Sequence, residues 1–284
     1  MEAVLDEPGP VKLETVVAAD WFVDRSGLIN LDHPKARAVH LENGDEPIEL
    51  IFHAVRHPTR GLFLVDTGVE RAFRDAPTQA LINGIISKLS HLERMTIHTL
   101  TGDFIANQSE PVSGVFLTHL HLDHVLGLRD VPLSADVYVG PGDARARSFE
   151  NLLTGSLYDR ALGEGRTLRE WVFHSDSSGA FAGVLDVFGD GTFWAISVPG
   201  HTQGTTAYLA RTPRGPVLLT GDACHTAWGW QNGVEPGSFS TDIEKSAESL
   251  AVLENLVLRH PRIEVRLGHQ ELRLSGSLVG RPSP

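Results

Sequence analysis

The sequence predicts a mixed α/β fold, in which short apolar strands are combined with helices. Several apolar-rich runs each end in a segment that contains Gly together with His or Asp, as expected where a buried strand leaves a core. A long segment near the C-terminus has apolar residues at helical spacing. With 284 residues, of which 41% are hydrophobic, the chain is long enough for one large core, so we expect a single domain over residues 1–284.

Two strands are expected first, over residues 48–55 and 61–65, with the Pro-containing segment 57–60 as the turn between them. A longer, helix-prone insertion follows over residues 70–106. Its apolar residues at helical spacing are Leu81, Ile85, Ile86 and Leu89. The sequence leaves open whether this insertion is a lid, a dimer surface or an ordinary packed helix.

A hairpin and a long helix are expected in the second half of the chain. Residues 184–188 and 192–196 flank Gly189-Asp190-Gly191, which supplies the residues that tolerate positive φ in a tight turn. Thr241 and Glu244 have the spacing of a capping box, and the helix that they start should end at Arg259-His260, before Pro261. The apolar face that we expect to cover the sheet consists of Ile243, Ala247, Leu250, Ala251 and Val257. The Gly/Ser/Pro-rich tail, residues 275–284, is expected to fray.

The most informative segment is residues 118–127, which follow the strand-like run 114–117. Within six consecutive positions it contains three imidazoles and one carboxylate: His119, His121, Asp123 and His124. His is the commonest protein ligand of zinc, and Asp adds an oxygen donor. His119 and His121 project to the same side of an extended segment, whereas Asp123 and His124 fall where the chain turns away. One short segment can therefore supply ligands to two adjacent metal ions.

Three later residues fit the same pattern, because each follows the end of an expected strand. His201 comes after the run 193–198, Asp222 after 217–219 and His269 after 263–266. Strand ends are rigid positions from which side chains can be presented to a common cleft. We therefore expect these residues to converge on the first segment.

These motifs resemble those of the metallo-β-lactamase superfamily, in order and over residues 50–270. The residues that carry the resemblance are Leu64-Val65-Asp66-Thr67-Gly68, Thr118-His119, His121, Asp123-His124, Pro199-Gly200-His201-Thr202, Thr220-Gly221-Asp222 and Leu267-Gly268-His269. The resemblance implies a four-layer αββα sandwich with a two-metal site along its edge. It also implies that His119, His121 and His201 hold one metal, that Asp123, His124 and His269 hold the other, and that Asp222 bridges both. Asp66 matches a position from which a carboxylate orients a ligating imidazole, and it also suits a turn after a strand.

Seven such ligands predict catalysis rather than a structural metal site. Two divalent ions about 3.5–4 Å apart can lower the pKa of a shared water toward 7 and polarise a carbonyl or phosphoryl oxygen. A structural zinc site is closed by four ligands and commonly includes Cys, of which this chain has one. We expect zinc first, with iron, manganese or cobalt as alternatives. The residues expected to take part in catalysis are Asp123, Asp222 and His225.

Composition disfavours nucleic-acid and membrane partners, and a small-molecule substrate is the partner expected of a hydrolase. A formal net charge of −12 disfavours the extended phosphate-binding surface of a nucleic-acid partner. The N-terminal residues show no secretory signal, and no stretch approaches the ~18 apolar residues of a membrane span, so neither export nor a membrane is expected. A cytoplasmic location is therefore expected, with which the single Cys is consistent. A homodimer stays open.

Among hydrolases of the superfamily, the chain most resembles N-acyl homoserine lactonases and related ester and organophosphate hydrolases. Glyoxalase II-like enzymes append a helical domain after the last ligand, where this chain has fifteen residues, and true β-lactamases of the superfamily lack the bridging Asp. One departure stands out: the lactonases generally have Tyr three residues after that Asp, and this chain has His225. A neutral imidazole can donate a hydrogen bond to a substrate carbonyl as Tyr does, or accept a proton, so His225 is either a substitute or a packing residue. Cys224 is expected to be a small buried residue rather than a ligand.

Trp228 and Trp230 precede a Gly/Pro-containing loop and are expected either to form a wall of the substrate pocket or to pack in the core. A pocket wall made of these indoles would indicate that the substrate has a hydrophobic part. Alternatives to an ester or lactone hydrolase are an organophosphate or β-lactam hydrolase on the same site, a mononuclear-iron dioxygenase, and a metal-binding protein without turnover.

Overall fold

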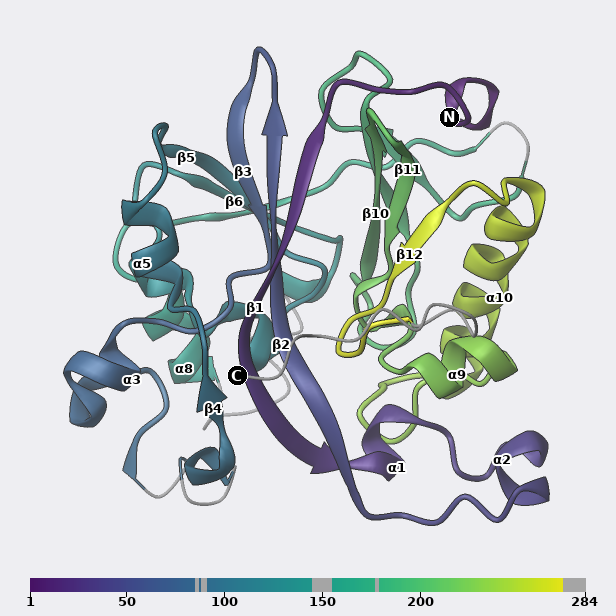
Figure 1. Ribbon diagram of the computed structural model, residues 1–284, viewed down its shortest axis with the longest axis horizontal. Helices are drawn as coiled ribbons and strands as arrows, with labels where there is room; N and C mark the ends of the chain where they lie inside the picture. The colour runs from purple at the N-terminus through teal and green to yellow at the C-terminus, as the bar shows by residue number, and fades with distance from the viewer. Residues whose placement is uncertain (85–86, 88–90, 145–154, 177–178, 273–284) are drawn as a thin grey trace, which may run out of the picture.

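Two β-sheets that pack face to face form the centre of the molecule, with helices on both outer sides (Figure 1). The computed structural model describes residues 1–84, 87, 91–144, 155–176 and 179–272. Within these residues no helix is both long enough and apolar enough to cross a membrane.

The first sheet has seven strands in the order β4-β1-β2-β3-β5-β6-β7. Its antiparallel part joins β4 to β1, β1 to β2 and β2 to β3, whereas β3, β5, β6 and β7 run parallel. The strands are β1 (Lys12–Asp24), β2 (Asp45–His57), β3 (Gly61–Val65), β4 (Thr96–Ile97), β5 (Val112–Phe116), β6 (Asp136–Val139) and β7 (Leu168–Glu170).

The second sheet has five strands in the order β12-β11-β10-β9-β8. All neighbours are antiparallel except β11 and β12, which run parallel. The strands are β8 (Val184–Asp186), β9 (Phe193–Ser197), β10 (Thr206–Thr212), β11 (Gly215–Leu219) and β12 (Glu264–Arg266).

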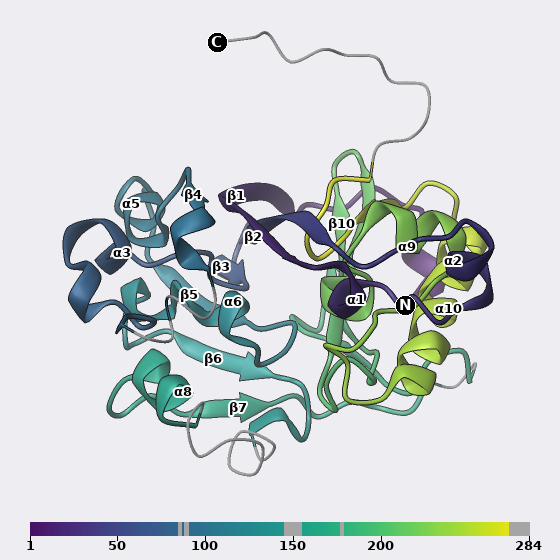
Figure 2. The ribbon, with the colours of Figure 1, turned by 90° about the horizontal axis from the view of Figure 1, so that it is seen from below.

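The helices form the outer layers, with α3, α5 and α8 beyond the first sheet and α9 and α10 beyond the second (Figures 1 and 2). The α-helices are α1 (Arg25–Leu28), α2 (Pro34–Ala38), α3 (Ala72–Asp75), α5 (Thr101–Ala106), α6 (Leu122–Val125), α8 (Gly155–Leu162), α9 (Ala227–Asn232) and α10 (Ile243–Arg259). The 3₁₀ turns are η1 (Glu2–Val4), η2 (Pro77–Gln79), η3 (Leu92–Arg94), η4 (Leu128–Asp130) and η5 (Gly221–Ala223).

Three apolar cores separate these four layers. The first sheet packs against α5 and α8 through a cluster that includes Phe52 and Phe104. The two sheets meet through aromatic residues, of which Phe116 of β5 lies 5.8 Å from Phe193 of β9, centroid to centroid. The second sheet packs against α10 through a cluster that includes Leu253. This arrangement confirms the predicted αββα sandwich.

The expected strands lie where the sequence predicted them. Residues 48–55 fall within β2 and residues 61–65 are β3, joined by the predicted turn. The hairpin also forms, since β8 and β9 pair antiparallel, and Gly189 and Gly191 take φ angles of 73° and 71°. Each of the apolar runs that precedes a candidate ligand is a strand: β5, β9, β11 and β12.

Residues 70–106 are less helical than expected. The described part consists of short turns and helices, and it includes an edge strand, β4, that pairs with β1. Leu81 is fully buried. Ile85, Ile86 and Leu89 lie outside the described residues, as do residues 275–284, so the helix through these positions and the fraying of the tail stay predictions.

The long helix α10 ends at Arg259 as predicted, but its cap and buried face differ from the prediction. Asp242 is the N-cap, because its carboxylate accepts a hydrogen bond from Lys245 N at 2.9 Å, while Thr241 N donates to His201 O instead. Ile243 and Ala251 are exposed. The helix is rotated relative to the expected face, and its buried residues are Ser246, Ser249, Leu250, Leu253 and Leu256. The two buried hydroxyls have acceptors there: Ser249 donates to Pro199 O outside the helix, and Ser246 donates to Asp242 O of the helix's own N-cap.

Candidate metal centre

The two sheets place all seven predicted ligands at one end of the sandwich. His119 and His121 follow β5, and Asp123 and His124 lie in the short helix α6 that comes next. His201, Asp222 and His269 follow β9, β11 and β12 of the second sheet. The centre therefore lies where strand ends of both sheets meet.

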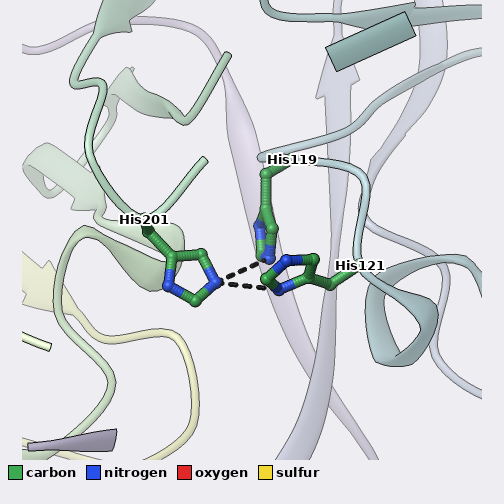
Figure 3. Close-up of side chains that lie close together, drawn as sticks. All are labelled: His119, His121 and His201. Atoms are coloured by element: carbon green, nitrogen blue, oxygen red, sulfur yellow. Dashed lines mark hydrogen bonds between the residues drawn. The ribbon is translucent and has the colours of Figure 1, made fainter. Parts of the chain in front are cut away.

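Three imidazoles form the first cluster (Figure 3). His201 Nε2 lies 3.2 Å from His119 Nε2 and 2.9 Å from His121 Nδ1. Burial lowers the pKa of His119, His121 and His201, well below the usual value for His119 and His201. A neutral imidazole has one ring nitrogen with a free lone pair, and metal ligation requires the tautomer in which the nitrogens that face one another carry these lone pairs.

The second cluster combines two carboxylates with two imidazoles: Asp123, His124, Asp222 and His269. His269 Nε2 lies 3.4 Å from Asp123 Oδ2, and His124 Nε2 lies 3.6 Å from the same oxygen. Burial opposes protonation of His124, but the carboxylates of Asp222, Asp66 and Asp123 together raise its pKa well above the usual value.

Asp222 lies between the two clusters. Its Oδ2 atom is 3.6 Å from His119 Nε2, 3.5 Å from His201 Nε2 and 3.3 Å from both His124 Nε2 and His269 Nε2. Although burial raises the pKa of Asp222, the surrounding imidazoles, His269 first, hold it well below the usual range. One ionised oxygen is thus shared by ring nitrogens of both clusters.

The space around this carboxylate depends on Gly268. A Cβ atom there would lie 2.3 Å from Asp222 Oδ1, so only Gly leaves room for the carboxylate. In the part of the chain that the structure describes, Asp222 Oδ1 and His124 Nε2 are buried without a hydrogen-bond partner. Unpartnered buried polar atoms of this kind are rare. His124 Nε2 lies near carboxylate oxygens of Asp222 and Asp123, which fits a centre built for cations.

The ring nitrogens that point away from the centre are anchored. His124 Nδ1 lies 2.9 Å from Asp66 Oδ2, and His269 Nδ1 lies 3.0 Å from Glu49 O. Such hydrogen bonds select the tautomer and orientation of a ligating imidazole. Asp66 also takes a left-handed φ of 59° and accepts from Thr118 N, so it orients His124 and forms the turn after β3. The two interpretations of Asp66 in the sequence are therefore compatible.

A buried carboxylate that the sequence analysis did not single out, Asp143, connects the two ligand-bearing loops. It accepts hydrogen bonds from Leu120 N, between His119 and His121, at 3.0 Å. It also accepts from Thr202 Oγ1 at 3.0 Å and from Gly204 N at 2.7 Å, in the loop that carries His201. Its position shortly after β6 repeats the pattern of the predicted ligands and is the signal by which it could have been found.

His225 also faces the centre. Its Nε2 atom lies 3.1 Å from Asp222 Oδ2, and its Nδ1 atom lies 3.1 Å from Leu28 O. Cys224 beside it is buried, and burial raises the pKa of its thiol to about 12, so it is the small buried residue that we expected.

Trp228 and Trp230 lie on a short helix, α9, ahead of the Gly/Pro-containing segment. The helix begins because Thr226 accepts a hydrogen bond from Gly229 N, and it ends at Gly233, which takes a left-handed φ of 57°. Both indoles are half-buried: Trp228 packs against the core of the first sheet, and Trp230 against the core under α10. For both residues this favours the core-packing alternative.

Comparisons with known proteins agree with this architecture. The family model described as the metallo-beta-lactamase superfamily matches residues 53–266. Among curated proteins, "Metallo-hydrolase mfmC" from Annulohypoxylon moriforme is 35% identical over 124 residues, which are 42% of this chain and 32% of the relative. "N-acyl homoserine lactonase AttM" from Agrobacterium fabrum is 30% identical over 150 residues, or 52% of this chain and 55% of the relative. The matched part of this chain thus spans between about a third and about half of these two relatives' lengths.

Solved structures show the same fold at lower identity. An N-acyl homoserine lactone hydrolase, described with the product N-hexanoyl-L-homoserine bound at its catalytic metal centre, superposes with a TM-score of 0.67 at 19% identity. The superposition covers 92% of this chain and 94% of that one. The likeness therefore extends over both sheets.

Proposed function

Because the chain belongs to the metallo-β-lactamase superfamily, we propose that it is a dinuclear metal-dependent hydrolase that opens an ester or lactone bond of a small substrate. The observation that carries this proposal is the position of Asp222 Oδ2, within 3.6 Å of ring nitrogens from both clusters. A carboxylate in that position suits a bridge between two cations, which would otherwise repel each other across a short gap.

The donor set supports two ions rather than one. His119, His121 and His201 would hold the first ion, Asp123, His124 and His269 would hold the second, and Asp222 would contact both. Seven side chains exceed what one tetrahedral ion accepts. Zinc suits a set of imidazoles and carboxylates, and iron, manganese and cobalt are the alternatives.

Two divalent ions held here would supply a shared water of lowered pKa and would polarise the carbonyl to be cleaved. The chain's own residues prepare the site for this chemistry. Asp66 and the Glu49 carbonyl hold the rings of His124 and His269 in the ligating orientation. Asp143 holds the two loops that carry the first cluster together. Burial of His119, His201 and Asp222 excludes bulk water, which strengthens electrostatic interactions within the site.

The lactone or ester specificity is supported by the relatives described as N-acyl homoserine lactonases and by the solved hydrolase with a homoserine product at its metal centre. Trp228 and Trp230 are both half-buried, so the exposed part of either indole would be available to contact a hydrophobic part of the substrate.

The test combines metal analysis with a substrate screen. Protein reconstituted with zinc should contain two ions per chain and should hydrolyse a lactone or aryl ester faster than a β-lactam, a thioester or a phosphotriester. One iron per chain with oxygen consumption would instead indicate a dioxygenase. Two ions without hydrolysis of any activated substrate would indicate a binding protein.

Asp222→Ala is the decisive variant. It should bind fewer than two ions and lose turnover by more than roughly 100-fold, since loss of residues that only support ligands already costs about 10–100-fold. Asp130→Ala is the matched control. Asp130 is a half-buried carboxylate that accepts hydrogen bonds from the backbone amides of Arg71 and Gly102, and it belongs to neither cluster. The control should keep both ions, whereas full occupancy and activity in Asp222→Ala would place Asp222 outside the centre.

A further inference from the structure

We infer that His225 is an eighth ligand of the metal centre, and that its Nε2 atom binds the ion held by His119, His121 and His201. The inference rests on the proposed function, because it requires that the centre hold metal. It assigns His225 a role other than donating a hydrogen bond to the substrate.

The position of the ring supports this assignment. His225 Nε2 lies 3.1 Å from Asp222 Oδ2, the shortest of the distances from ring nitrogens to that oxygen given above. One ligand atom each from His201, Asp222 and His225 lies within 4.8 Å of the other two. The ring centroids of His225 and His201 are 4.9 Å apart. His225 is 1% exposed, so its ring is held in the buried site and does not sample solvent.

The hydrogen bond on the far side of the ring decides what Nε2 can do. Nδ1 lies 3.1 Å from Leu28 O, and a carbonyl oxygen can only accept, so Nδ1 carries the proton. Metal ligation requires a neutral imidazole, so with the proton on Nδ1 a bound cation would meet the lone pair of Nε2. An Nε2 atom that binds a cation has no proton to donate to a substrate carbonyl.

The same arrangement occurs at a residue already proposed as a ligand. His269 Nδ1 lies 3.0 Å from Glu49 O, and its Nε2 faces Asp222. The rings of His225 and His269 are stacked with an interplanar angle of 11°. Both imidazoles are thus anchored through a backbone carbonyl and aim Nε2 at the shared carboxylate, as ligating imidazoles do.

An eighth ligand would make the two halves of the centre chemically different. The first ion would be held by four imidazoles and the shared carboxylate, the second by two imidazoles and two carboxylates. Imidazole favours zinc, iron and other later transition metals, whereas carboxylate also suits manganese. We therefore expect the first ion to be retained against chelators longer than the second, and the second to exchange more readily.

The test measures metal binding rather than turnover. Metal-free wild type and His225→Ala are titrated with zinc against a chromophoric chelator, and separately with cobalt(II), whose visible absorption reports coordination. His225→Ala should bind one ion at least roughly tenfold more weakly and should change the cobalt spectrum. Added imidazole, which can occupy the space left by the side chain, should recover part of both signals.

His57→Ala is the matched control. His57 is also a buried imidazole, but it pairs with Asp190 at 2.8 Å, away from the clusters. His57→Ala should leave zinc affinity and the cobalt spectrum unchanged. This control distinguishes the effect of removing any buried imidazole from the effect of removing a metal ligand. If His225→Ala does not fold, His225→Gln is used, because Gln keeps most of the side-chain volume but lacks the imidazole nitrogen that would bind the ion. A changed cobalt spectrum in that variant would then support ligation by His225.

Unchanged affinity and an unchanged cobalt spectrum in a folded His225 variant would overturn the inference, whatever happens to turnover. Failure of the proposed function has a different signature. A wild type that binds one ion, or that binds two and hydrolyses nothing, would contradict the proposed hydrolase, while the difference in affinity between wild type and variant would still decide the role of His225.

Discussion

Single imidazoles in this protein differ in behaviour according to what faces each ring nitrogen. His225 and His269 donate through Nδ1 to backbone carbonyls, whereas His124 has a carboxylate, Asp66, on the same side. A carbonyl selects one tautomer without adding charge, and a carboxylate also favours the protonated ring. Burial opposes protonation of both His124 and His269, but Asp222 raises the pKa of each ring, and the additional carboxylate of Asp66 helps to raise that of His124 well above its usual value.

His53 provides a test of how a buried imidazole affects stability. It lies in β2 with Nδ1 2.9 Å from Thr15 Oγ1, and burial, together with the nearby Arg266 charge, lowers its pKa from 6.5 to about 3. A lowered pKa in the folded state means that the unfolded chain binds the proton more readily below pH 6.5. The contribution of neutral His53 to the free energy of unfolding is therefore present above pH 6.5 and is lost as the pH falls toward 3, by about 1.4 kcal/mol per pH unit.

His53→Gln should remove this part of the pH dependence, because Gln does not titrate and can still bond to Thr15. We expect the free energy of unfolding of metal-free wild type to fall by about 2 kcal/mol more than that of the variant between pH 7 and pH 5. Urea unfolding of both proteins at the two pH values measures the difference. Parallel losses in the two proteins would show that His53 is protonated in the folded state.

At the level of elements, α10 shows that a helix start depends on which side chain reaches the free amides. Thr241 and Glu244 have the spacing of a capping box, yet Asp242 accepts from Lys245 N. Thr241 instead contacts the His201 loop: its hydroxyl donates to Gly200 O, and its amide, which a capping box would pair with Glu244, donates to His201 O. Thr241, which the local pattern assigned to the start of the helix, therefore forms its hydrogen bonds with the loop that carries His201.

Removal of the actual cap should be measurable. Asp242→Ala should lower the free energy of unfolding by about 1 kcal/mol, because it leaves amides in the first turn without a partner. Glu244→Ala is the control, since Glu244 is exposed in the same turn, and it should change stability by less than about 0.5 kcal/mol. Denaturation midpoints of the two variants distinguish the caps, and a larger loss for Glu244→Ala would favour the capping box.

At the level of the whole molecule, the proposed metals would connect the two sheets. His119, His121, Asp123 and His124 belong to the half built on the first sheet, and His201, Asp222 and His269 to the half built on the second. Ions that bind the folded chain but not the unfolded chain would therefore stabilise the packing of one sheet on the other.

Chelation should lower the melting temperature of the wild type. An ion present at 100 times its dissociation constant adds about 2.7 kcal/mol to the free energy of unfolding, and this is lost when the ion is removed. Calorimetry with and without a chelator measures the shift, and the shift should be smaller for Asp222→Ala, which we expect to bind fewer than two ions. A wild-type melting temperature that does not respond to complete metal removal would mean that the ions do not hold the sheets together.

The sequence determined the strands that precede the candidate ligands, and with them the location of those ligands. Apolar runs such as residues 61–65 indicate buried strands directly. The His and Asp residues that follow such runs lie at strand ends, and this position does not depend on distant parts of the chain. The cluster of His119, His121, Asp123 and His124 is local, so it is visible without any tertiary contact. The αββα architecture followed from the resemblance that these motifs carry.

Tertiary structure alone decided which side chains support the centre. The tautomer of His225 depends on Leu28 O, 197 residues away, and Asp143 joins loops that contain Leu120 and Thr202. The true cap of α10 follows from contacts of Thr241 with the His201 loop. Periodicity and spacing describe how neighbours in the chain are placed, whereas hydrogen bonds are short and directional, so their partners are known only once the fold has brought distant segments within about 3 Å of one another.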